Sequence, residues 1–136
     1  MKTFKVKTHS RAEFVNVTDI VQRAVAQSGV SDGMCYVYVP HTTAGITINE
    51  SADPAVQADI LDKLEEMAPR SPHYRHLEGN ADSHVKASLM GSSAAIPVES
   101  GRLTLGTWQA IYFCEFDGPR SRSLLVQVVS SRQQSE

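Results

Sequence analysis

The chain has 136 residues, the size of one domain, because domains most often have roughly 100–150 residues. With 41% hydrophobic and 21% charged residues, it has the composition of a globular protein, which excludes a largely disordered chain. The net charge of −2 and the scattered basic residues argue against nucleic-acid or membrane-surface binding, which both favour basic patches.

The cysteines and the start of the chain indicate a cytoplasmic protein. Cys35 and Cys114 each lie in an apolar run and form no CxxC pair, as expected of buried thiols in a reducing compartment. No apolar run reaches the roughly 18 residues of a membrane span. Residues 1–8 alternate polar and apolar side chains and lack the apolar region of a signal peptide. We therefore expect one soluble, cytoplasmic domain over residues 1–136.

The first 50 residues predict strands around one helix. Alternation from Thr3 to His9 predicts a strand, and residues 33–39, which are apolar on both faces, predict a central one. Between them, Thr18 is a candidate N-cap of a helix that Ser28-Gly29 would end. A further β-like stretch covers residues 43–48.

The middle of the chain predicts two more helices separated by a loop. Asp53-Pro54 gives a carboxylate cap followed by a proline at the first helical position. The apolar stripe of this helix consists of Val56, Ile60, Leu61, Leu64 and Met67. Residues 70–81 lack periodicity and predict a long loop. After it, Asp82 or Ser83 would cap a short helix that ends near Met90.

From residue 94 onward the chain is nearly all strand. The predicted strands are Ala95–Glu99, Leu103–Leu105, Trp108–Phe116 and Ser123–Ser130. The last two flank Asp117-Gly118-Pro119-Arg120, which predicts a hairpin-type connection. The sum is an α+β fold with a sheet of about six to eight short strands and three helices.

Three histidines are candidate metal ligands. His76 and His84 flank a polar, acidic loop, and His84 would lie in the first turn of a helix, where the dipole favours the neutral, metal-binding imidazole. His41 follows a buried strand and a proline, and Glu50 comes nine residues later. The histidines could supply three nitrogens to a zinc-like ion with a position left open. Alternatively, the loop histidines are incidental, His41 satisfies a backbone carbonyl and Glu50 is a helix-start acid.

Glu115 is the most informative carboxylate. Its strand is apolar on both faces, so we expect the carboxylate to be buried. Because an unpaired buried charge is costly, it must be paired or lie in a hydrated cleft. Arg120 or Arg122 could pair with it as a structural ion pair, or could hold a phosphate bidentately. They could also be solubilising residues of the hairpin. Trp108, which follows a strand-breaking glycine, could belong to the core, floor a pocket for a flat ring or contact another subunit.

Three blocks of the sequence together resemble the YjbQ-like family, also called the secondary thiamine-phosphate synthase family. The first runs from His41 to Glu50 (HTTAGITINE) and is followed by Asp53-Pro54. The second runs from His76 to Ser88, and the third from Gly101 to Gln109. They match in order and spacing, and the resemblance spans nearly the whole chain.

The resemblance implies a fold, an assembly and a site. The expected fold is a curled, meander-like, mixed or antiparallel sheet that approaches a half-barrel, assembled as a homotrimer. It also implies a metal-and-anion site near a subunit boundary. The implied metal ligands are His41, His76 and His84, for zinc or alternatively magnesium. The implied catalytic residues are Glu50, Lys86 and Glu115. The implied substrate or anion ligands are Asn49, Asn80 and Ser83, to which our own reading of the residues adds Trp108 and Arg120.

The activity associated with the family is weak coupling of a pyrimidine diphosphate to a thiazole phosphate. Such a reaction needs donors that neutralise the leaving diphosphate, and Lys86 or Arg120 could provide them. Three histidines on zinc are more typical of water activation. A metal-dependent hydrolase of a small phosphorylated metabolite, with Glu50 or Glu115 as general base, is therefore the alternative. A third hypothesis is a non-catalytic trimeric module that binds a metal and an anion.

Overall fold

The computed structural model describes residues 1–131, which contain eight strands and three helices. The strands are β1 (Lys2–Lys7), β2 (Glu13–Asn16), β3 (Gly33–Tyr38), β4 (Ala44–Glu50), β5 (Ser93–Glu99), β6 (Arg102–Leu103), β7 (Gln109–Glu115) and β8 (Ser121–Ser130). The helices are α1 (Thr18–Ser28), α2 (Pro54–Met67) and α3 (Ala81–Met90). The prediction of one domain over 1–136 includes residues 132–136, which lie outside the described residues.

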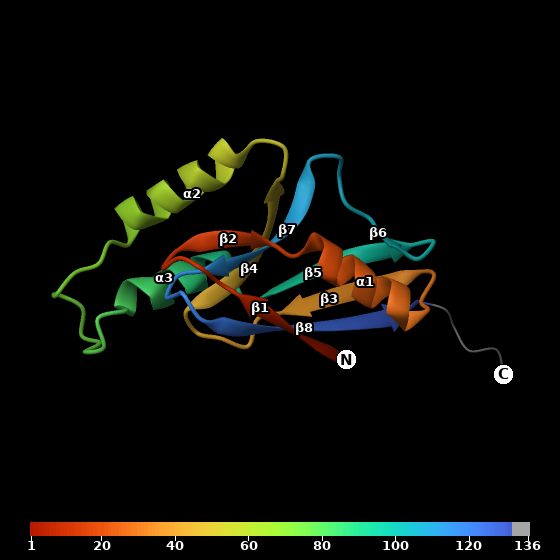
Figure 1. The fold of residues 1–136 in the computed structure, drawn as a ribbon, viewed down its shortest axis with the longest axis horizontal. Helices are drawn as coiled ribbons and strands as arrows, with labels where there is room; N and C mark the ends of the chain where they lie inside the picture. The colour runs from red at the N-terminus through yellow and green to blue at the C-terminus, as the bar shows by residue number, and fades with distance from the viewer. Residues whose placement is uncertain (132–136) are drawn as a thin grey trace.

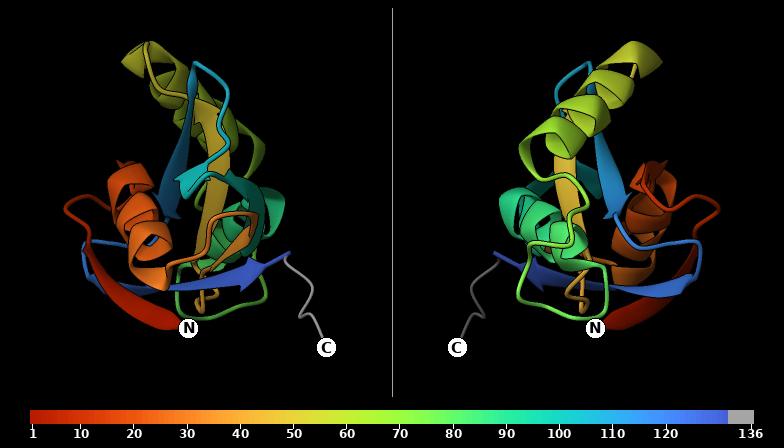
Figure 2. Two further views of the ribbon diagram at one scale, coloured as in Figure 1. Left: turned by 90° about the vertical axis from the view of Figure 1, so that its right-hand side faces the viewer. Right: turned by 90° about the vertical axis from the view of Figure 1, so that its left-hand side faces the viewer.

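The strands form two antiparallel sheets. One has the order β1-β8-β3-β5-β6, and the other has the order β2-β7-β4. In the side views of Figure 2, β4 and β7 rise while β8 crosses beneath them, so the sheets curl together into a half-barrel. The predicted α+β half-barrel is confirmed. The strands do not form a simple meander, in which neighbouring strands follow one another along the chain. In the described residues, β5 and β6 are the one pair of neighbouring strands that are also consecutive in sequence.

The main core lies between the two sheets and α1. Val21 and Val25 of α1 pack with inward residues of both sheets, such as Val37 and Phe113. A smaller cluster, which includes Leu64 of α2 and Phe116, fills the space beside α2 and α3. Figure 1 shows α1 on one side of the five-stranded sheet and α2 extending along β4 and β7. Cys35 and Cys114 are free and buried, as predicted.

The helix boundaries follow local signals with one displacement. Gly29, at a φ of 70°, ends α1 in a left-handed conformation that glycine adopts without strain. Asp53 caps α2, because its Oδ1 accepts a hydrogen bond from the N–H of Ala55 at 2.9 Å. The cap predicted at Asp82 or Ser83 is wrong. α3 begins at Ala81 after Asn80, and both predicted caps are instead side chains buried within its first turn.

The amphipathic stripe of α2 is only partly buried. Leu64 is its one fully buried residue, Ile60 and Leu61 are partly buried, and Met67 is 61% exposed. Since the helix lies along the rim of the half-barrel (Figure 1), the rest of the described chain covers only part of the stripe.

The predicted hairpin between the last two long strands is wrong. β7 pairs with β2 and β4, whereas β8 pairs with β1 and β3, so the chain turns a corner from one sheet to the other. A Cβ on Gly118 would lie 2.4 Å from the carbonyl oxygen of Ser10, so glycine lets the corner pack against the β1–β2 loop. β2, the partner that β7 uses instead, was missed because its four residues give too little alternation to read.

Candidate functional site

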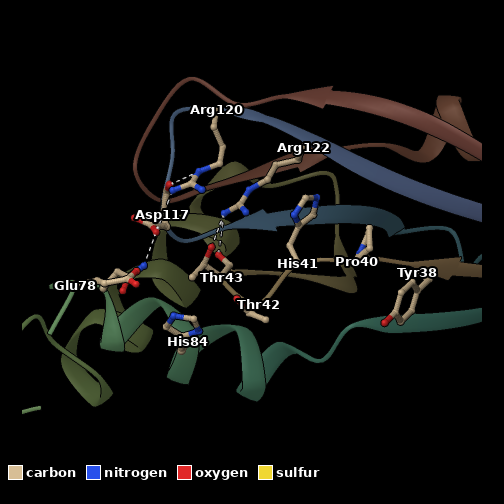
Figure 3. A pocket seen from close by; sticks show the side chains of 11 residues that line it. Tyr38, Pro40, His41, Thr42, Thr43, Glu78, His84, Asp117, Arg120 and Arg122 are labelled. Atoms are coloured by element: carbon tan, nitrogen blue, oxygen red, sulfur yellow. Dashed lines mark hydrogen bonds and ion pairs between the residues drawn. The ribbon is translucent and has the colours of Figure 1, made fainter. Parts of the chain in front are cut away.

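A cavity of about 640 Å³ opens where three segments meet: the β3–β4 loop, the segment that leads into α3, and the corner after β7. It is lined by Tyr38, Pro40, His41, Thr42, Thr43, Glu78, Asn80, His84, Asp117, Arg120 and Arg122 (Figure 3). A second hollow of about 510 Å³ shares His41, Thr42 and His84 with it. The wall is mainly polar and carries cations, carboxylates and imidazoles.

α3 reaches this cavity because it packs closely on β4. A Cβ on Gly45 would lie 2.7 Å from the carbonyl oxygen of Gly91. That oxygen accepts a hydrogen bond from the N–H of Ile46 at 3.0 Å. A larger side chain at Gly45 would push α3, and with it His84, away from His41.

Arg122 is a buried cation at the floor of the cavity. Its side chain is 3% exposed, and its Nε donates to both carboxylate oxygens of Glu115, at 3.1 and 2.8 Å. Its Nη2 donates to Thr43 Oγ1 at 2.8 Å, a contact visible in Figure 3. Within residues 1–131 no hydrogen bond uses Nη1. This nitrogen is not fully enclosed by the described residues. It is therefore the part of the guanidinium that a ligand can reach.

Glu115 lies behind Arg122 and is completely buried. Besides the bonds from Nε and Nη2 of Arg122, its Oε1 accepts a hydrogen bond from Thr8 Oγ1 at 2.8 Å. The predicted pairing of Glu115 is confirmed, with Arg122 as the partner. Because both oxygens are engaged, the carboxylate orients the guanidinium and is poorly placed to accept a proton from a substrate.

Arg120 is the second cation of the cavity wall. Its Nη2 lies 3.1 Å from Asp117 Oδ2, and its Nε donates to the carbonyl oxygen of Asp117 at 2.9 Å. Asp117 also accepts a hydrogen bond from Asn80 Nδ2 at 2.8 Å. Asn80 Oδ1 is buried without a hydrogen-bond partner within the described chain. Since buried acceptors are normally satisfied, this enclosed oxygen is a place where a buried water would donate a hydrogen bond.

His41 contributes a neutral imidazole. Its Nε2 accepts a hydrogen bond from the backbone N–H of Ser123 at 2.9 Å, so the neutral ring carries its proton on Nδ1. Burial, reinforced by the positive charge of Arg122, lowers the pKa of His41 below its ordinary value. At neutral pH this ring therefore offers one N–H donor and no free lone pair.

The histidines do not form the predicted three-ligand centre. The rings of His76 and His84 meet edge to face with centroids 5.1 Å apart, and His76 Nε2 lies 3.6 Å from Glu78 Oε2. Among residues 1–131, no group of three or more His, Cys, Asp or Glu side chains is arranged to hold a metal ion. With Nε2 of His41 already bonded, the donor set does not fit a three-histidine zinc site.

Three of the predicted residues lie at the opposite end of the β4–β7 ladder. Glu50 pairs with Gln109 at one end and Ala44 with Glu115 at the other, so about 20 Å of strand separates Glu50 from the cavity. Glu50 Oε2 accepts the N–H groups of Ser51 and Ala52 at 3.1 and 3.3 Å. The predicted members of this end are Asn49, Glu50 and Trp108. Trp108 is 63% exposed, so it belongs neither to the core nor to the cavity.

Lys86 and Ser83 are not part of the cavity lining either. The Lys86 amino group is held by Asp82 at 3.2 Å and by Glu65, and Asp82 in turn pairs with Arg11 at 3.2 Å. Ser83 Oγ donates to the carbonyl oxygen of Phe116 at 2.5 Å. Both side chains therefore fasten α3 to the rest of the fold.

Sequence reasoning did not single out several residues that the cavity uses. Thr43 fixes Arg122, and Asp117 fixes Arg120 and Asn80. The polar run that follows Pro40 and the Asp-Gly of the corner were the available signals for them. Tyr38 gave no such signal, because it reads as one residue of an apolar strand.

Proteins of similar sequence identify the family of this chain. The model of the family described as UPF0047 protein, YjbQ-like, matches residues 2–131. The chain belongs to the YjbQ/UPF0047 family. A UPF0047 protein of Methanocaldococcus jannaschii is 47% identical over 129 residues, which are 95% of this chain and 94% of that protein. The UPF0047 protein YugU of Bacillus subtilis is 47% identical over 130 residues, 95% of this chain and 98% of that one.

Solved structures of the YjbQ/UPF0047 family share the fold. A family member from Clostridium acetobutylicum superposes with a TM-score of 0.93 at 53% identity and covers 95% of this chain and 100% of its own. A conserved hypothetical protein from Thermus thermophilus gives 0.88 at 43% identity, with coverages of 95% and 100%. A YjbQ-like protein from Sulfolobus solfataricus gives 0.91 at 35% identity, with 96% of each chain covered, and is described as of unknown function.

No helix within residues 1–131 is long and apolar enough to cross a membrane.

Proposed function

We propose that this YjbQ-family protein binds the phosphate or diphosphate group of a small metabolite in the 640 Å³ cavity that His41 and His84 line. Arg120 and Arg122, two arginines fixed by carboxylates, reach one cavity, and Nη1 of each is free of hydrogen bonds within residues 1–131. A guanidinium held in a fixed orientation suits the oxygens of a phosphate, which it binds through parallel N–H donors. This observation carries the proposal.

Two further groups of the wall are donors suited to an anionic ligand. The N–H on Nδ1 of His41 is a further donor. The hydroxyl of Thr43 accepts from Arg122, which leaves its own proton for a ligand. These groups would orient the ligand between the two arginines.

The reaction class that fits best is group transfer of the secondary thiamine-phosphate synthase type. In that coupling, the bond between the pyrimidine's methylene carbon and the diphosphate oxygen breaks, and the diphosphate leaves with the electron pair. The thiazole phosphate supplies the nucleophile that bonds to the carbon. Negative charge grows on the leaving oxygen, and two oriented arginines with the N–H of His41 would stabilise it.

The alternative of a hydrolase is less well supported because it needs a general base for water. Glu50 lies at the far end of β4, and Glu115 is engaged by Arg122 and Thr8. Binding of zinc or magnesium, assembly as a homotrimer and a cytoplasmic location stay predictions. Metal analysis of the purified protein tests the first.

Incubation with a pyrimidine diphosphate, a thiazole phosphate or both tests the function. We expect thiamine phosphate only when both are present, and at least tenfold less from Arg122→Gln protein. Release of phosphate from either compound alone would replace coupling with hydrolysis. Binding without any turnover would replace it with a non-catalytic anion-binding module.

A further inference from the structure

Both cavity arginines are connected to one buried hydroxyl, that of Thr8. Thr8 is the residue that follows β1 and is 2% exposed. Its Oγ1 accepts a hydrogen bond from the backbone N–H of Arg120 at 2.9 Å and lies 2.8 Å from Glu115 Oε1. Glu115 in turn holds Arg122. A single hydroxyl therefore touches the support of each arginine.

The direction of these hydrogen bonds follows from what each atom can donate. Thr8 Oγ1 also lies 3.0 Å from the carbonyl oxygen of Arg120, but that oxygen already accepts the N–H of Thr8 at 2.9 Å. The one hydroxyl proton is thus best used on the carboxylate of Glu115, since bonds to charged acceptors are the stronger ones. The chain of donors runs from Arg120 N–H through the hydroxyl to Glu115, which Arg122 approaches from the other side.

We infer that Thr8 is a positioning residue of the anion site, which sets the spacing of Arg120 and Arg122 without touching the ligand. The inference rests on the proposed function. The hydroxyl fixes the backbone at which the Arg120 side chain starts and, through Glu115, the plane of the Arg122 guanidinium. Without it, the N–H of Arg120 and one oxygen of Glu115 each lose a partner in a buried place. The two guanidinium groups then no longer present their Nη1 donors at one fixed separation.

Substitutions at Thr8 separate the hydroxyl from the volume of the side chain. Thr8→Val keeps the shape and removes the hydroxyl, and Thr8→Ser keeps the hydroxyl. Thr8→Cys keeps a weak donor and serves if the valine variant does not fold. Thr3→Val is the matched control, because Thr3 is an exposed threonine of β1, the strand that Thr8 follows. Binding of inorganic diphosphate is measured by calorimetry at a temperature where circular dichroism shows each variant folded.

We expect the valine variant to bind diphosphate about tenfold more weakly than the wild type, the fold-change for the loss of one well-placed hydrogen bond. The cysteine variant should lie between them, and the serine and Thr3 variants should bind within about twofold of the wild type. Unchanged affinity in the valine variant, or in the cysteine variant if it replaces valine, would overturn the inference and leave the proposed function standing. Equal weakening by serine would also overturn it. No binding by the wild type would overturn the proposed function, and this inference with it.

Discussion

At the scale of single residues, Glu115 was a candidate general base, but its contacts make it a residue that orients Arg122. Its strand brings it into the core with both oxygens bonded to Arg122 and Thr8. Replacing one partner of a buried ion pair leaves the other charge uncompensated, which costs about 3–5 kcal/mol. We expect Glu115→Gln to lower the melting temperature, measured by circular dichroism.

The same variant distinguishes support from catalysis. Because the carboxylate orients the Arg122 guanidinium, folded Glu115→Gln protein should bind inorganic diphosphate more weakly than the wild type, while its turnover with saturating substrate should fall by no more than about tenfold. Had Glu115 been a general base, turnover would fall by about 10²–10⁴. A stable variant with turnover reduced that far would contradict our interpretation.

His41 is expected to stay neutral through the physiological range. Burial and Arg122 lower its pKa in the folded protein, whereas the unfolded chain has a pKa of about 6.5. The stability that this difference contributes is therefore complete above about pH 6.5 and is lost as the pH falls through the folded pKa. A nuclear magnetic resonance titration of the His41 ring should give a midpoint below 6.5. A midpoint at or above that value would refute the assignment of a neutral Nδ1–H donor.

At the scale of elements, α3 is fastened by charges rather than by a large apolar face. Asp82 in its first turn contacts Arg11 and Lys86 and is 1% exposed. Burial alone would raise the pKa of Asp82, but the hydrogen bonds from Arg11 and Lys86 outweigh it and lower that pKa. The stabilisation is thus present above about pH 4 and is lost as the pH falls through the folded pKa.

This network predicts a specific response to Asp82→Asn. The amide keeps the shape of the side chain but leaves Lys86 without its buried counter-ion, so the free energy of unfolding at pH 7 should fall by about 1–3 kcal/mol. The difference from the wild type, measured by urea denaturation, should shrink as the pH approaches 3. A difference that stays constant from pH 7 to pH 3 would show that the charge of Asp82 is not what stabilises α3.

The elements also show how far the sequence could predict this molecule. α1 and α2 were predictable because Gly29 and Asp53 act locally, through a left-handed φ and a side-chain cap. The corner after β7 was not predictable as such. Asp117-Gly118 reads as a hairpin turn, and only the pairing of β7 with β2 and β4 moves the next strand into the other sheet.

The candidate site was also only partly predictable from the sequence. His41, His84, Asn80 and Arg120 were predicted and line one cavity. The block from His41 to Glu50 suggested a single site, but the extended β4 carries its two ends apart. The roles of Thr8 and Asp117 depend on contacts between distant segments, which spacing along the chain does not reveal.

At the scale of the whole molecule, the five-stranded sheet carries an apolar patch on its outer face. Cys35 and Val37 point inward, so the alternation of β3 turns Tyr36 and Tyr38 outward, where they are 47% and 48% exposed. Val129 of β8, opposite Met34 of β3, is 47% exposed on the same face. Such a face favours contact with another copy, and Tyr38 also borders the cavity.

We expect the predicted homotrimer to form through this face. Light scattering at micromolar concentration should give about three times the mass of the chain, and Tyr36→Asp should reduce it by placing a charge in the contact. Circular dichroism controls for folding. A wild-type protein with the mass of one chain would contradict the prediction.

The most direct test of the whole account is a calorimetric titration of the wild type and Arg122→Gln with inorganic diphosphate, in the presence of a chelator. We expect the wild type to bind one diphosphate per chain without added metal. The variant should bind at least tenfold more weakly, since a charged hydrogen bond to a phosphate is worth about 1.5–3 kcal/mol. Equal binding by the two proteins, or binding that the chelator abolishes, would contradict it.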